Sequence, residues 1–386
     1  MAVAHCRCDH CQQERLVPVY EVADSKRGMA VYVCRNCGLV QSLSSGAGGS
    51  PRVVSTSSGA DWGNVRHGKG LRLGQALKVL EPLVRWDHIG KALDIGSNRG
   101  DFVKWLWESH PEIKIHAVEP DGSLVAPYQS LSSVTLSIGR FETVPISTGS
   151  IDFVYCCHTL EHADSAATML GRIHGCMSDS GLVFVDVPNI DAISERDVVE
   201  EFFIDKHTFH FSRPIFCRML QSAGFHILWG EDGKDLHNIT VVAVKKPQGG
   251  SNCTSPSGEE IYEYYAAAIE AYANRLQENR RKLREVGAKL NEFMQRQKVA
   301  FWGAGRLFDA LVKFGGLDAN RASAVIDTYL APILPRIHGV EVHTPEHLKW
   351  SPPDVVVILA RSSAEEISRA VLRFQIRHII RFKDLL

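Results

Sequence analysis

Residues 91–100 read KALDIGSNRG, and this stretch decides the fold. A short apolar run ends in Gly96 and Gly100, and residues 101–107 then repeat apolar side chains at helical spacing. Gly96 lets the backbone approach a ligand closely, and Gly100 lets the following helix pack on the strand. The stretch therefore predicts a strand, a glycine turn and a helix, which together open an α/β fold with a cofactor site.

An acidic residue closes the next predicted strand. Residues 115–119 read IHAVE and place Glu119 25 residues after Asp94. A carboxylate at this position can accept two hydrogen bonds from a ribose diol. The whole series predicts a cofactor that contains ribose, although Asp94 and Glu119 taken singly could be ordinary polar residues at strand ends.

The pattern Asp94-x-Gly96-x-x-x-Gly100 differs from the dinucleotide pattern GxGxxG and resembles the first motif of the class I S-adenosylmethionine-dependent methyltransferases. Later segments extend the resemblance over residues 65–246: FETVP (141–145), SIDFVY (150–155), HTLEH (158–162) and CMSDSGLVFV (176–185). The resemblance implies that S-adenosylmethionine is the methyl donor. It also implies ten cofactor contacts: Asp94, Gly96, Ser97, Gly100, Glu119, Pro120, Phe141, Glu142, His158 and Leu160.

Composition narrows the class of protein. The chain has 386 residues, of which 45% are hydrophobic and 23% charged, with a formal net charge of −1, as in globular proteins of two or three domains. Without a basic excess we expect no nucleic-acid partner and no anionic membrane surface. No apolar run is long enough for a membrane span, and the N-terminus MAVAHCRCDHC lacks the apolar centre of a signal peptide. We therefore expect a cytoplasmic protein whose ten cysteines are reduced thiols or metal ligands.

Polar stretches divide the chain into three blocks. Residues 1–42 are rich in cysteine, 65–246 alternate strand and helix patterns, and 259–386 begin with a long helical run. Linkers rich in Ser and Gly separate them at 42–60 and 247–259. The prediction is an α/β protein with an N-terminal four-cysteine zinc-binding module, a central Rossmann-like methyltransferase sheet and a smaller C-terminal Rossmann-like α/β domain.

Four cysteines form two pairs at metal-ligand spacing. Cys8 and Cys11 make one CxxC knuckle and Cys34 and Cys37 another, with 22 residues between them. Four thiolates are the tetrahedral set that structural Zn²⁺ prefers, and a module of about forty residues needs such a staple. The alternatives are unligated thiols or Cys6 in place of Cys8. A DNA-reading finger is disfavoured, because no basic recognition helix follows.

Residues 203–212 read FIDKHTFHFS and hold two histidines beside an acid. We call this segment the histidine loop. It follows a predicted strand at 182–187 and precedes a predicted helix with Ser212 as its cap and Pro214 in its first turn. The histidine loop is therefore expected at the carboxyl edge of the sheet, where α/β folds bind their ligands.

The order and sizes of the three parts resemble the deoxysugar C-methyltransferases, which methylate carbon 3 of a 4-keto nucleotide-diphosphate sugar. Where that family reads roughly Tyr-His-Glu-His, this chain has Ile204, Asp205, Lys206 and His207. The family's Ala-His after the fourth strand matches Glu161-His162. The resemblance implies a catalytic set of His207 as the base, His162 as its partner, Glu161 and Asp205.

The chemistry gives these histidines a role and also leaves a rival interpretation. A carbon nucleophile forms when a proton next to a carbonyl is removed, and a histidine with a pKa near 7 suits that step. The enolate oxygen then needs a donor or a cation, which the family's tyrosine can be and Ile204 cannot. O- and N-methyltransferases carry a similar loop and depend on proximity instead, with His207 only a hydrogen-bonded loop residue. His210, between Phe209 and Phe211, is more typical of a packed histidine, with substrate contact as the alternative.

The last block carries a second glycine turn. Residues 298–306 read KVAFWGAGR, and a further predicted strand at 322–326 ends at Asp327. Such a turn presents backbone N–H groups to a diphosphate at a helix N-terminus. By resemblance this domain helps to bind the nucleotide-sugar, and a purely structural domain is the alternative. The substrate contacts expected are Gly303, Gly305, Arg306, Arg336 and His338, with His210 from the histidine loop.

Three functions remain open at this point. The leading one is C-methylation of a nucleotide-diphosphate sugar or a related sugar-like metabolite. The second is O- or N-methylation of another small metabolite or natural product, and the third is a non-catalytic protein that binds S-adenosylmethionine or acts as a zinc scaffold. The helical run at 259–297 is compatible with a monomer or a homodimer.

Overall fold

The computed structural model describes residues 7–23, 25–44, 71–230, 235–245, 257–360 and 363–385. They fall into two compact units. Unit 1 contains the cysteine-rich segment and residues 73–195 and 202–273, and unit 2 contains 196–201 and the chain from 274 onward. Cys6 and most of both predicted linkers lie outside the described residues.

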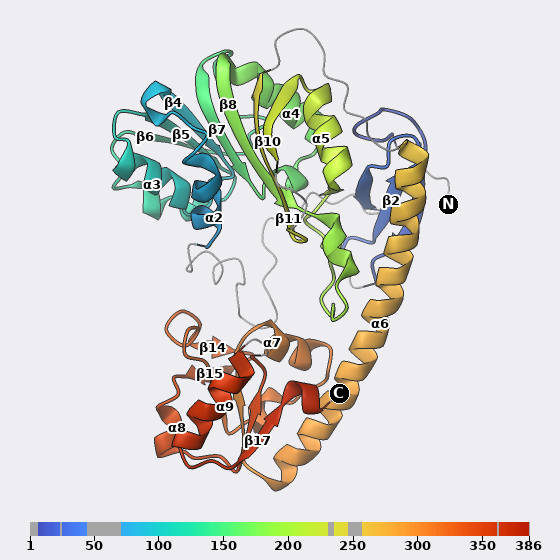
Figure 1. Cartoon of the computed structure of the whole chain (residues 1–386), viewed down its shortest axis with the longest axis vertical. Helices are drawn as coiled ribbons and strands as arrows, with labels where there is room; N and C mark the ends of the chain where they lie inside the picture. Colours follow the sequence, from blue (N-terminus) through green and yellow to red (C-terminus); the bar gives the residue numbers. More distant parts are fainter. Residues whose placement is uncertain are drawn as a thin grey trace. The chain divides into compact units, whose positions relative to one another are not determined.

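Unit 1 is built on a seven-stranded mixed sheet with the strand order β10-β11-β8-β7-β4-β5-β6 (Figure 1). Its strands are β4 (Lys91–Ile95), β5 (Lys114–Glu119), β6 (Val134–Ile138), β7 (Ile151–Cys157), β8 (Met177–Pro188), β10 (Phe225–Gly230) and β11 (Asn238–Lys245). Neighbours from β6 to β8 are parallel, whereas β11 runs antiparallel to both β8 and β10. The last four residues of β4 are buried, as expected of a central strand that is covered on both faces.

Helices and short turns connect these strands. They are α2 (Leu71–Leu80), α3 (Asp101–Ser109), α4 (Ala166–Cys176) and α5 (Arg213–Ser222), with 3-10 turns at η1 (Trp86–His88), η2 (Gly122–Leu124), η3 (Ala126–Tyr128), η4 (Leu160–His162) and η5 (Ile190–Ser194). The Phe102 ring of α3 stacks on Tyr155 with 4.0 Å between centroids, and Tyr155 stacks on Phe184 at 5.1 Å. This aromatic stack packs α3 against β7 and β8 and so fixes the position of the turn between β4 and α3.

The direction in which strands are added reverses next to β4. From β4 the chain steps outward to β5 and β6 and then returns to β7 on the other side of β4. At such a switch point the connections leave in opposite directions and open a crevice at the carboxyl ends, where α/β proteins bind ligands. Gly96 follows β4 directly and His158 follows β7 directly, so both lie at the carboxyl ends of the two strands that flank the switch point.

Two local expectations from the sequence are corrected. Strand β8 begins at Met177 rather than near 182, because Met177 already pairs with Ile151 before a shift of register. Ser212 occupies the N-cap position of α5, but its hydroxyl makes no capping hydrogen bond. Pro214, within the first two helical positions, therefore marks the helix start instead.

A second sheet of unit 1 joins the cysteine-rich segment to the histidine loop. Its order is β1-β2-β3-β9, with β1 (Leu16–Glu21), β2 (Met29–Cys34), β3 (Val40–Ser44) and β9 (Phe209–His210). Strand β9 is antiparallel to β3, with Val40 opposite His210 and Gln41 opposite Phe209. The histidine loop thus contributes a strand to a sheet whose other strands come from the start of the chain.

Unit 2 contains a six-stranded sheet in the order β14-β15-β13-β12-β16-β17. The elements are β12 (Val299–Trp302), α7 (Arg306–Lys313), η6 (Ala319–Arg321), β13 (Ala324–Ile326), β14 (Arg336–Ile337), β15 (Val340–His343), α8 (His347–Trp350), β16 (Val355–Ile358), α9 (Ala364–Arg373), β17 (His378–Arg381) and η8 (Phe382–Asp384). All paired strands are parallel except β14 and β15, which form a hairpin.

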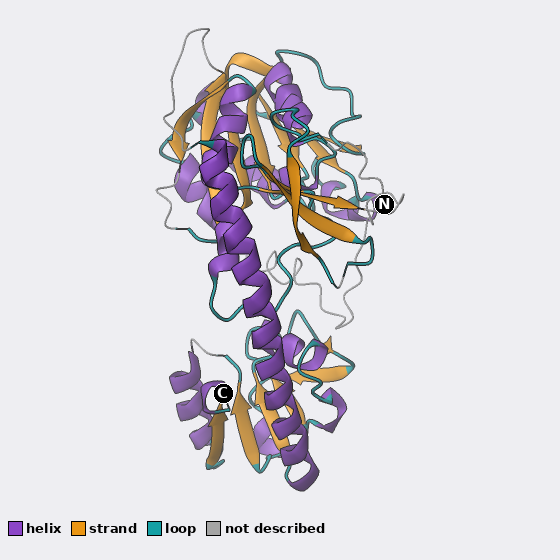
Figure 2. Ribbon diagram, turned by 90° about the vertical axis from the view of Figure 1, so that its right-hand side faces the viewer, coloured by secondary structure: helices purple, strands orange, loops and turns teal. Residues whose placement is uncertain are grey.

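Helix α6 (Gly258–Arg296) is one continuous helix (Figure 2), and its residues up to 273 belong to unit 1 and the rest to unit 2. Its first turn carries Glu259 and Glu260, which favour a helix N-terminus. Within the described ranges, none of the helices combines the length and the apolar character that crossing a membrane requires.

Candidate functional site

The four predicted metal ligands come together in unit 1. The sulfur atoms of Cys8, Cys11, Cys34 and Cys37 all lie within 4.8 Å of one another. Cys8 Sγ is 3.5 Å from Cys37 Sγ, and Cys11 Sγ is 3.6 Å from Cys34 Sγ. A disulfide would need about 2.05 Å, whereas sulfurs about 2.3 Å from a tetrahedral zinc ion are roughly 3.8 Å apart. The donor set therefore fits a structural zinc ion.

The second knuckle packs against the start of α6. Gly38 has a φ of +83°, and a Cβ there would lie 2.3 Å from Cγ2 of Ile261. A Cβ on Gly258 would lie 1.8 Å from the carbonyl oxygen of Asn36. Since both glycines allow this close approach, the cysteine cluster and the first turn of α6 form one packed element.

The glycine turn after β4 is packed by two side chains from elsewhere in unit 1. Gly96, with φ +72°, faces Thr159, whose Oγ1 would lie 2.1 Å from a Cβ on the glycine. Gly100, with φ +77°, faces the ring of Tyr128 at 3.0 Å from such a Cβ. The Tyr128 hydroxyl lies 2.7 Å from Ser97 Oγ and 2.8 Å from the carbonyl oxygen of Asn98. The protein's own side chains thus hold the turn in one conformation.

Two buried carboxylates adjoin this turn. Glu119, 5% exposed, accepts the N–H of Asn98 at 2.7 Å on one oxygen and that of Asp121 at 2.9 Å on the other. Each carboxylate oxygen has a second acceptor site, so Glu119 keeps the capacity for the two hydroxyls of a ribose. Burial raises the pKa of Glu119 and of Asp94, and for Asp94 the carboxylates of Glu119 and Asp101 raise it further. A ligand that carries positive charge would relieve this repulsion.

The Asp94→Asn variant is expected to be more stable than the natural protein at neutral pH and yet to bind S-adenosylmethionine about tenfold more weakly. Because folding raises the pKa of Asp94, the cost of the carboxylate is absent at low pH and grows as the pH rises through the folded-state pKa. Each kcal/mol regained would raise the melting temperature by roughly 2–4 °C. Thermal melts at acid and neutral pH, with calorimetry on S-adenosylmethionine, measure both effects. A lower melting temperature at neutral pH would contradict the expected sign.

The remaining cofactor residues predicted from sequence lie around the same edge of the sheet. Phe141 and Leu160 are buried, and the guanidinium of Arg172 lies 5.3 Å from the centre of the Phe141 ring. Ser97 is buried at the turn, and Pro120 is exposed directly after β5. Phe141 is thus anchored by a cation, with an apolar body suited to an adenine ring.

Glu142 is held in an ion pair. Its Oε1 accepts from Arg140 Nη2 at 3.0 Å and from the N–H of Asp164 at 3.4 Å. Burial is the largest single influence and by itself would raise the pKa of Glu142, but the hydrogen bond and charge of Arg140 together with backbone N–H donors lower the pKa overall. Arg140 also donates to the carbonyl oxygen of His162 at 3.3 Å. Glu142 therefore steadies the turn that carries His162.

A cluster of histidines and a carboxylate lies just beyond β7. Glu161 is 1% exposed, and its two carboxylate oxygens have no hydrogen-bond partner among the described residues. Its Oε1 lies 3.6 Å from His158 Nδ1 and 3.6 Å from His162 Nε2. His207 approaches from the histidine loop, with 4.8 Å between its ring centroid and that of His162. A buried carboxylate is costly unless it is paired with a positive charge. The imidazoles beside Glu161 can supply that charge by taking up a proton.

The two histidines of this pair lie in different environments. His162 has 33% of its side chain exposed, and its Nδ1 lies 2.8 Å from the carbonyl oxygen of Lys206. That acceptor fixes the proton on Nδ1 and leaves the lone pair on Nε2. Burial lowers the pKa of His207 well below its ordinary value, and the neighbouring His162 and His210 lower it further. His207 is therefore neutral at pH 7.

His158, predicted as a cofactor contact, is tied into the sheet. It has a φ of +49°, and its Nε2 lies 3.0 Å from Asn238 Oδ1 and 3.3 Å from Asp186 Oδ2. Asp186 also accepts the hydroxyl of Thr240 at 2.7 Å. Sequence reasoning missed Asp186, although an acid inside the apolar run VFVDVP at the end of a buried strand is a signal that could have found it.

Asp205, predicted beside the histidines, is bound to the cysteine-rich module. Its carboxylate accepts the hydroxyl of Ser25 on Oδ1 and the N–H of Lys26 at 3.0 Å on Oδ2. Arg27 Nη1 donates to the carbonyl oxygen of Asp205 at 3.0 Å. All of these partners lie on the turn between β1 and β2.

His210 has a packed environment. It is 3% exposed, its Nε2 lies 2.7 Å from Ser42 Oγ, and its ring stands edge-on to that of Phe203 with 4.7 Å between centroids. Burial lowers the pKa of His210 to about 3. The residue therefore links β9 to β3 as a neutral hydrogen-bonding group.

The glycine turn of unit 2 lies at the carboxyl end of β12. The N–H of Gly303 donates to the carbonyl oxygen of Ile326 at 2.7 Å, and Asp327 accepts the N–H of Ala304 at 3.0 Å. Gly305 is the N-cap of α7, and a Cβ there would meet no atom within 4 Å. Arg306 Nη1 forms an ion pair with Glu200 Oε2 at 3.1 Å, also within unit 2. The turn thus leaves room beside Gly305.

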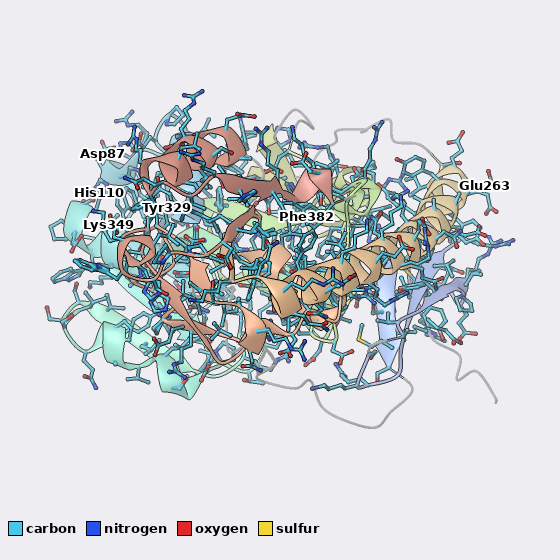
Figure 3. All side chains as sticks on the ribbon, turned by 90° about the horizontal axis from the view of Figure 1, so that it is seen from below. Asp87, His110, Glu263, Tyr329, Lys349 and Phe382 are labelled. Carbon is cyan, nitrogen blue, oxygen red and sulfur yellow. The ribbon has the colours of Figure 1, made fainter. Side chains whose placement is uncertain are left out.

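Arg336 and His338 lie on and beside the β14–β15 hairpin. Arg336 is exposed and pairs with Glu341 at 2.9 Å. His338 Nε2 lies 2.8 Å from Oδ1 of the buried Asp309, which also pairs with Lys313. The loop after β13 exposes 77% of Tyr329, which is labelled in Figure 3.

Comparison with known proteins places the central part of the chain in a class. Residues 72–228 match the family model described as a methyltransferase domain. The chain is similar to solved structures of S-adenosylmethionine-dependent methyltransferases from Mesorhizobium loti (14% identity, 44% of this chain and 96% of that chain, TM-score 0.37) and Clostridium acetobutylicum (14% identity, 48% and 100%, TM-score 0.40). At such TM-scores these likenesses carry no weight of their own. None of the curated proteins gives a match.

The matched residues include the glycine turn after β4, Glu119 at the end of β5, the Glu161–His162 turn and the histidine loop. Residues 72–228 therefore form a class I S-adenosylmethionine-dependent methyltransferase domain. The chain is an enzyme that transfers methyl groups from this donor.

Proposed function

We propose that the enzyme methylates a carbon next to the ketone of a nucleotide-diphosphate 4-keto deoxysugar. The observation that carries this proposal is the cluster of Glu161, His162 and His207 beside the switch point. Such an acceptor must lose a proton before it can accept a methyl group, and the cluster offers the base. S-adenosylmethionine, when bound, supplies the electrophilic methyl group, and the turn at 94–100 with Glu119 would hold it.

Within the cluster, His162 is the better placed histidine to keep the proton. Its Nε2 carries the lone pair, and Glu161 at 3.6 Å stabilises the imidazolium that forms. The surroundings of His207 disfavour its charged form, as its lowered pKa indicates. We therefore assign the proton to His162 and the partner role to His207, which reverses the order that the sequence favours.

Two further features support a diphosphate-containing acceptor and a bound zinc ion. The Gly303–Gly305 turn precedes α7 in unit 2, and backbone N–H groups at a helix N-terminus suit a diphosphate. Arg306 is the first residue of that helix, and its guanidinium is paired with Glu200 at 3.1 Å. The four cysteines would hold zinc, which in a closed set of four thiolates stabilises the fold and takes no part in the reaction.

O- or N-methylation of another small metabolite is the second candidate, and Ile204 favours it. The family's tyrosine could donate to an enolate oxygen, whereas Ile204 has no donor. Methyl transfer to oxygen or nitrogen does not form an enolate and depends mainly on alignment with the methyl donor.

Calorimetry and isotope exchange separate these functions. We expect S-adenosylmethionine to bind, and we expect the protein in D₂O to exchange the proton next to the ketone of a nucleotide-diphosphate 4-keto deoxysugar without the methyl donor. Added donor should then give a product that mass spectrometry finds heavier by one methyl group. Donor binding without exchange would favour O- or N-methylation, and the absence of donor binding would leave a scaffold protein.

A further inference from the structure

We propose that the cysteine-rich module holds the histidine loop in place, with Asp205 as the positioning residue, so that the metal site controls where His207 lies. The inference rests on the proposed function only in giving His162 and His207 a part in the reaction. Its structural content is that residues 7–23 and 25–44 and the histidine loop are ordered together.

The pairing of β9 with β3 is the first support. Strand β9 has two residues, and strands of that length do not persist without a partner. Its partner edge begins at Val40, three residues after Cys37. The geometry of the second cysteine knuckle therefore decides whether this edge is available to the histidine loop.

A chain of backbone hydrogen bonds carries this order to the histidine pair. The N–H of Ser42 in β3 donates to the carbonyl oxygen of Thr208 at 2.8 Å. The N–H of Thr208 donates to the carbonyl oxygen of Glu161 at 2.8 Å. Thr208 follows His207 directly, and Glu161 precedes His162 directly, so one residue links the module to both histidines.

Asp205 fixes the other end of the histidine loop. The hydroxyl of Ser25 accepts the N–H groups of Arg27 at 3.1 Å and Met29 at 3.0 Å and donates its proton to the Asp205 carboxylate. The same carboxylate accepts from Lys26. Hydrogen bonds to an ionised acceptor are the stronger kind, so this contact sets both the β1–β2 turn and the loop.

The metal site controls the module because the module is small. Cys34 is the last residue of β2, and Cys37 lies just before β3. Two of the four ligands are therefore in the turn that joins β2 to β3, the strand that pairs with β9. Domains of about forty residues cannot bury enough apolar surface alone, and in structural zinc modules the free energy of metal binding is folding free energy. Loss of the metal would therefore release the histidine loop, whereas the glycine turn after β4 depends on Thr159 and Tyr128 instead.

The Asp205→Asn variant tests the positioning role, with Asp152→Asn as its matched control. Asp152 likewise accepts one serine hydroxyl, from Ser178 at 3.0 Å, and backbone N–H groups, from Gly90 and Lys91 at 3.0 Å each, but it lies at the amino end of β7. In Asp205→Asn the amide would turn an N–H₂ group toward the Lys26 N–H. Amide hydrogen exchange of residues 203–211 should then become about 10- to 100-fold faster, and that of 91–100 should not change.

The control defines what each outcome means. Asp152→Asn should leave exchange in 203–211 as it is in the natural protein. If exchange in 203–211 is the same in Asp205→Asn and the natural protein, the proposal is wrong. If Asp205→Asn unfolds as a whole, exchange at 91–100 accelerates too, and the milder Ser25→Ala variant then decides by the same measurement.

Removal of the metal from the whole chain tests the second part of the proposal, that the metal site controls the position of the histidine loop. We expect a strong chelator to release zinc and to speed amide exchange in residues 29–44 and 203–211, while the affinity for S-adenosylmethionine changes by less than about threefold. Added Zn²⁺ should restore the protection. If residues 203–211 keep their protection from exchange in the metal-free protein, the metal site does not hold the histidine loop. If the affinity for S-adenosylmethionine falls as strongly as the protection does, the effect is not specific to the loop, and the proposal is wrong as well. Neither measurement needs an acceptor. If the sugar substrate is neither exchanged nor methylated, the proposed function is wrong, but the conclusion about the histidine loop is unaffected.

Discussion

The His162→Gln variant is expected to exchange the proton next to the acceptor ketone about 10²- to 10⁴-fold more slowly than the natural enzyme. Glutamine keeps a hydrogen-bonding side chain of similar size but cannot accept the proton, and Glu161 is left without an imidazolium to stabilise. Exchange in D₂O, followed by mass spectrometry or NMR, measures the rate directly. The affinity for S-adenosylmethionine should change little, because the glycine turn and Glu119 follow β4 and end β5, whereas His162 follows β7.

Two comparisons make this result specific. His110→Gln is the control for loss of a partly exposed histidine, since His110 lies at the end of α3 and pairs with Glu112 instead. His207→Gln should slow the exchange by a smaller factor than His162→Gln does. The reverse order would return the role of base to His207, and full activity in both variants would exclude the pair from the proton transfer.

The Gly96→Ala variant is expected to lose at least about 100-fold in affinity for S-adenosylmethionine. Its Cβ would lie 2.1 Å from Thr159 Oγ1, and alanine rarely adopts a φ of +72°. Thr159 cannot move freely, since its hydroxyl donates to the carbonyl oxygens of Ile95 and Cys157, each at 3.1 Å. It also precedes η4, so the strain reaches Glu161 and His162 as well.

Calorimetry and the exchange assay should both register the Gly96 change. Gly171→Ala is the matched control, because Gly171 lies inside α4 and a Cβ added there would meet no atom within 4 Å. That substitution should be neutral or should stabilise the helix by about 0.5–1 kcal/mol. Normal donor affinity in Gly96→Ala would show that the turn can relax and that its tight packing against Thr159 is not required for binding.

Local patterns predicted much of what surrounds the donor site. The glycine turn, the acid at the end of β5 and the cysteine pairs are short motifs whose geometry follows from residue type and spacing. The structure places Gly96, Gly100 and Glu119 at the same edge of the sheet, where β4 and β5 end, and brings the four cysteine sulfurs together. Such features are readable because each depends on neighbours within a few residues or on a parallel pair of adjacent strands.

The histidine cluster was only partly readable. Its members were found from a resemblance, but the division of roles proposed for His162 and His207 rests on the lowered pKa of His207 and on the Lys206 carbonyl. Neither is a property of spacing along the chain. Tyr128, which fills the space beside Gly100, also carries no sequence signal, because it reaches the turn through tertiary packing.

The contacts of Asp205 could not be predicted from the sequence. In the sequence it stands two residues before His207, and the resemblance to the sugar methyltransferase loop implied a place in the catalytic set. In the structure its partners are Ser25, Lys26 and Arg27, about 180 positions away along the chain. Contacts across such separations depend on the completed fold, and a single sequence offers no pattern for them.

The pairing of β3 with β9 also limits how this protein can be recombined. Side chains alternate between the two faces of a strand, so the loss or gain of one residue between Cys37 and Val40 would turn every later side chain of β3 to the opposite face. Ser42 would then no longer meet His210, 168 positions further on. A chimera that takes its first forty-odd residues from a homologue should therefore inherit the homologue's counterpart of 203–211 as well, as a single transplanted unit.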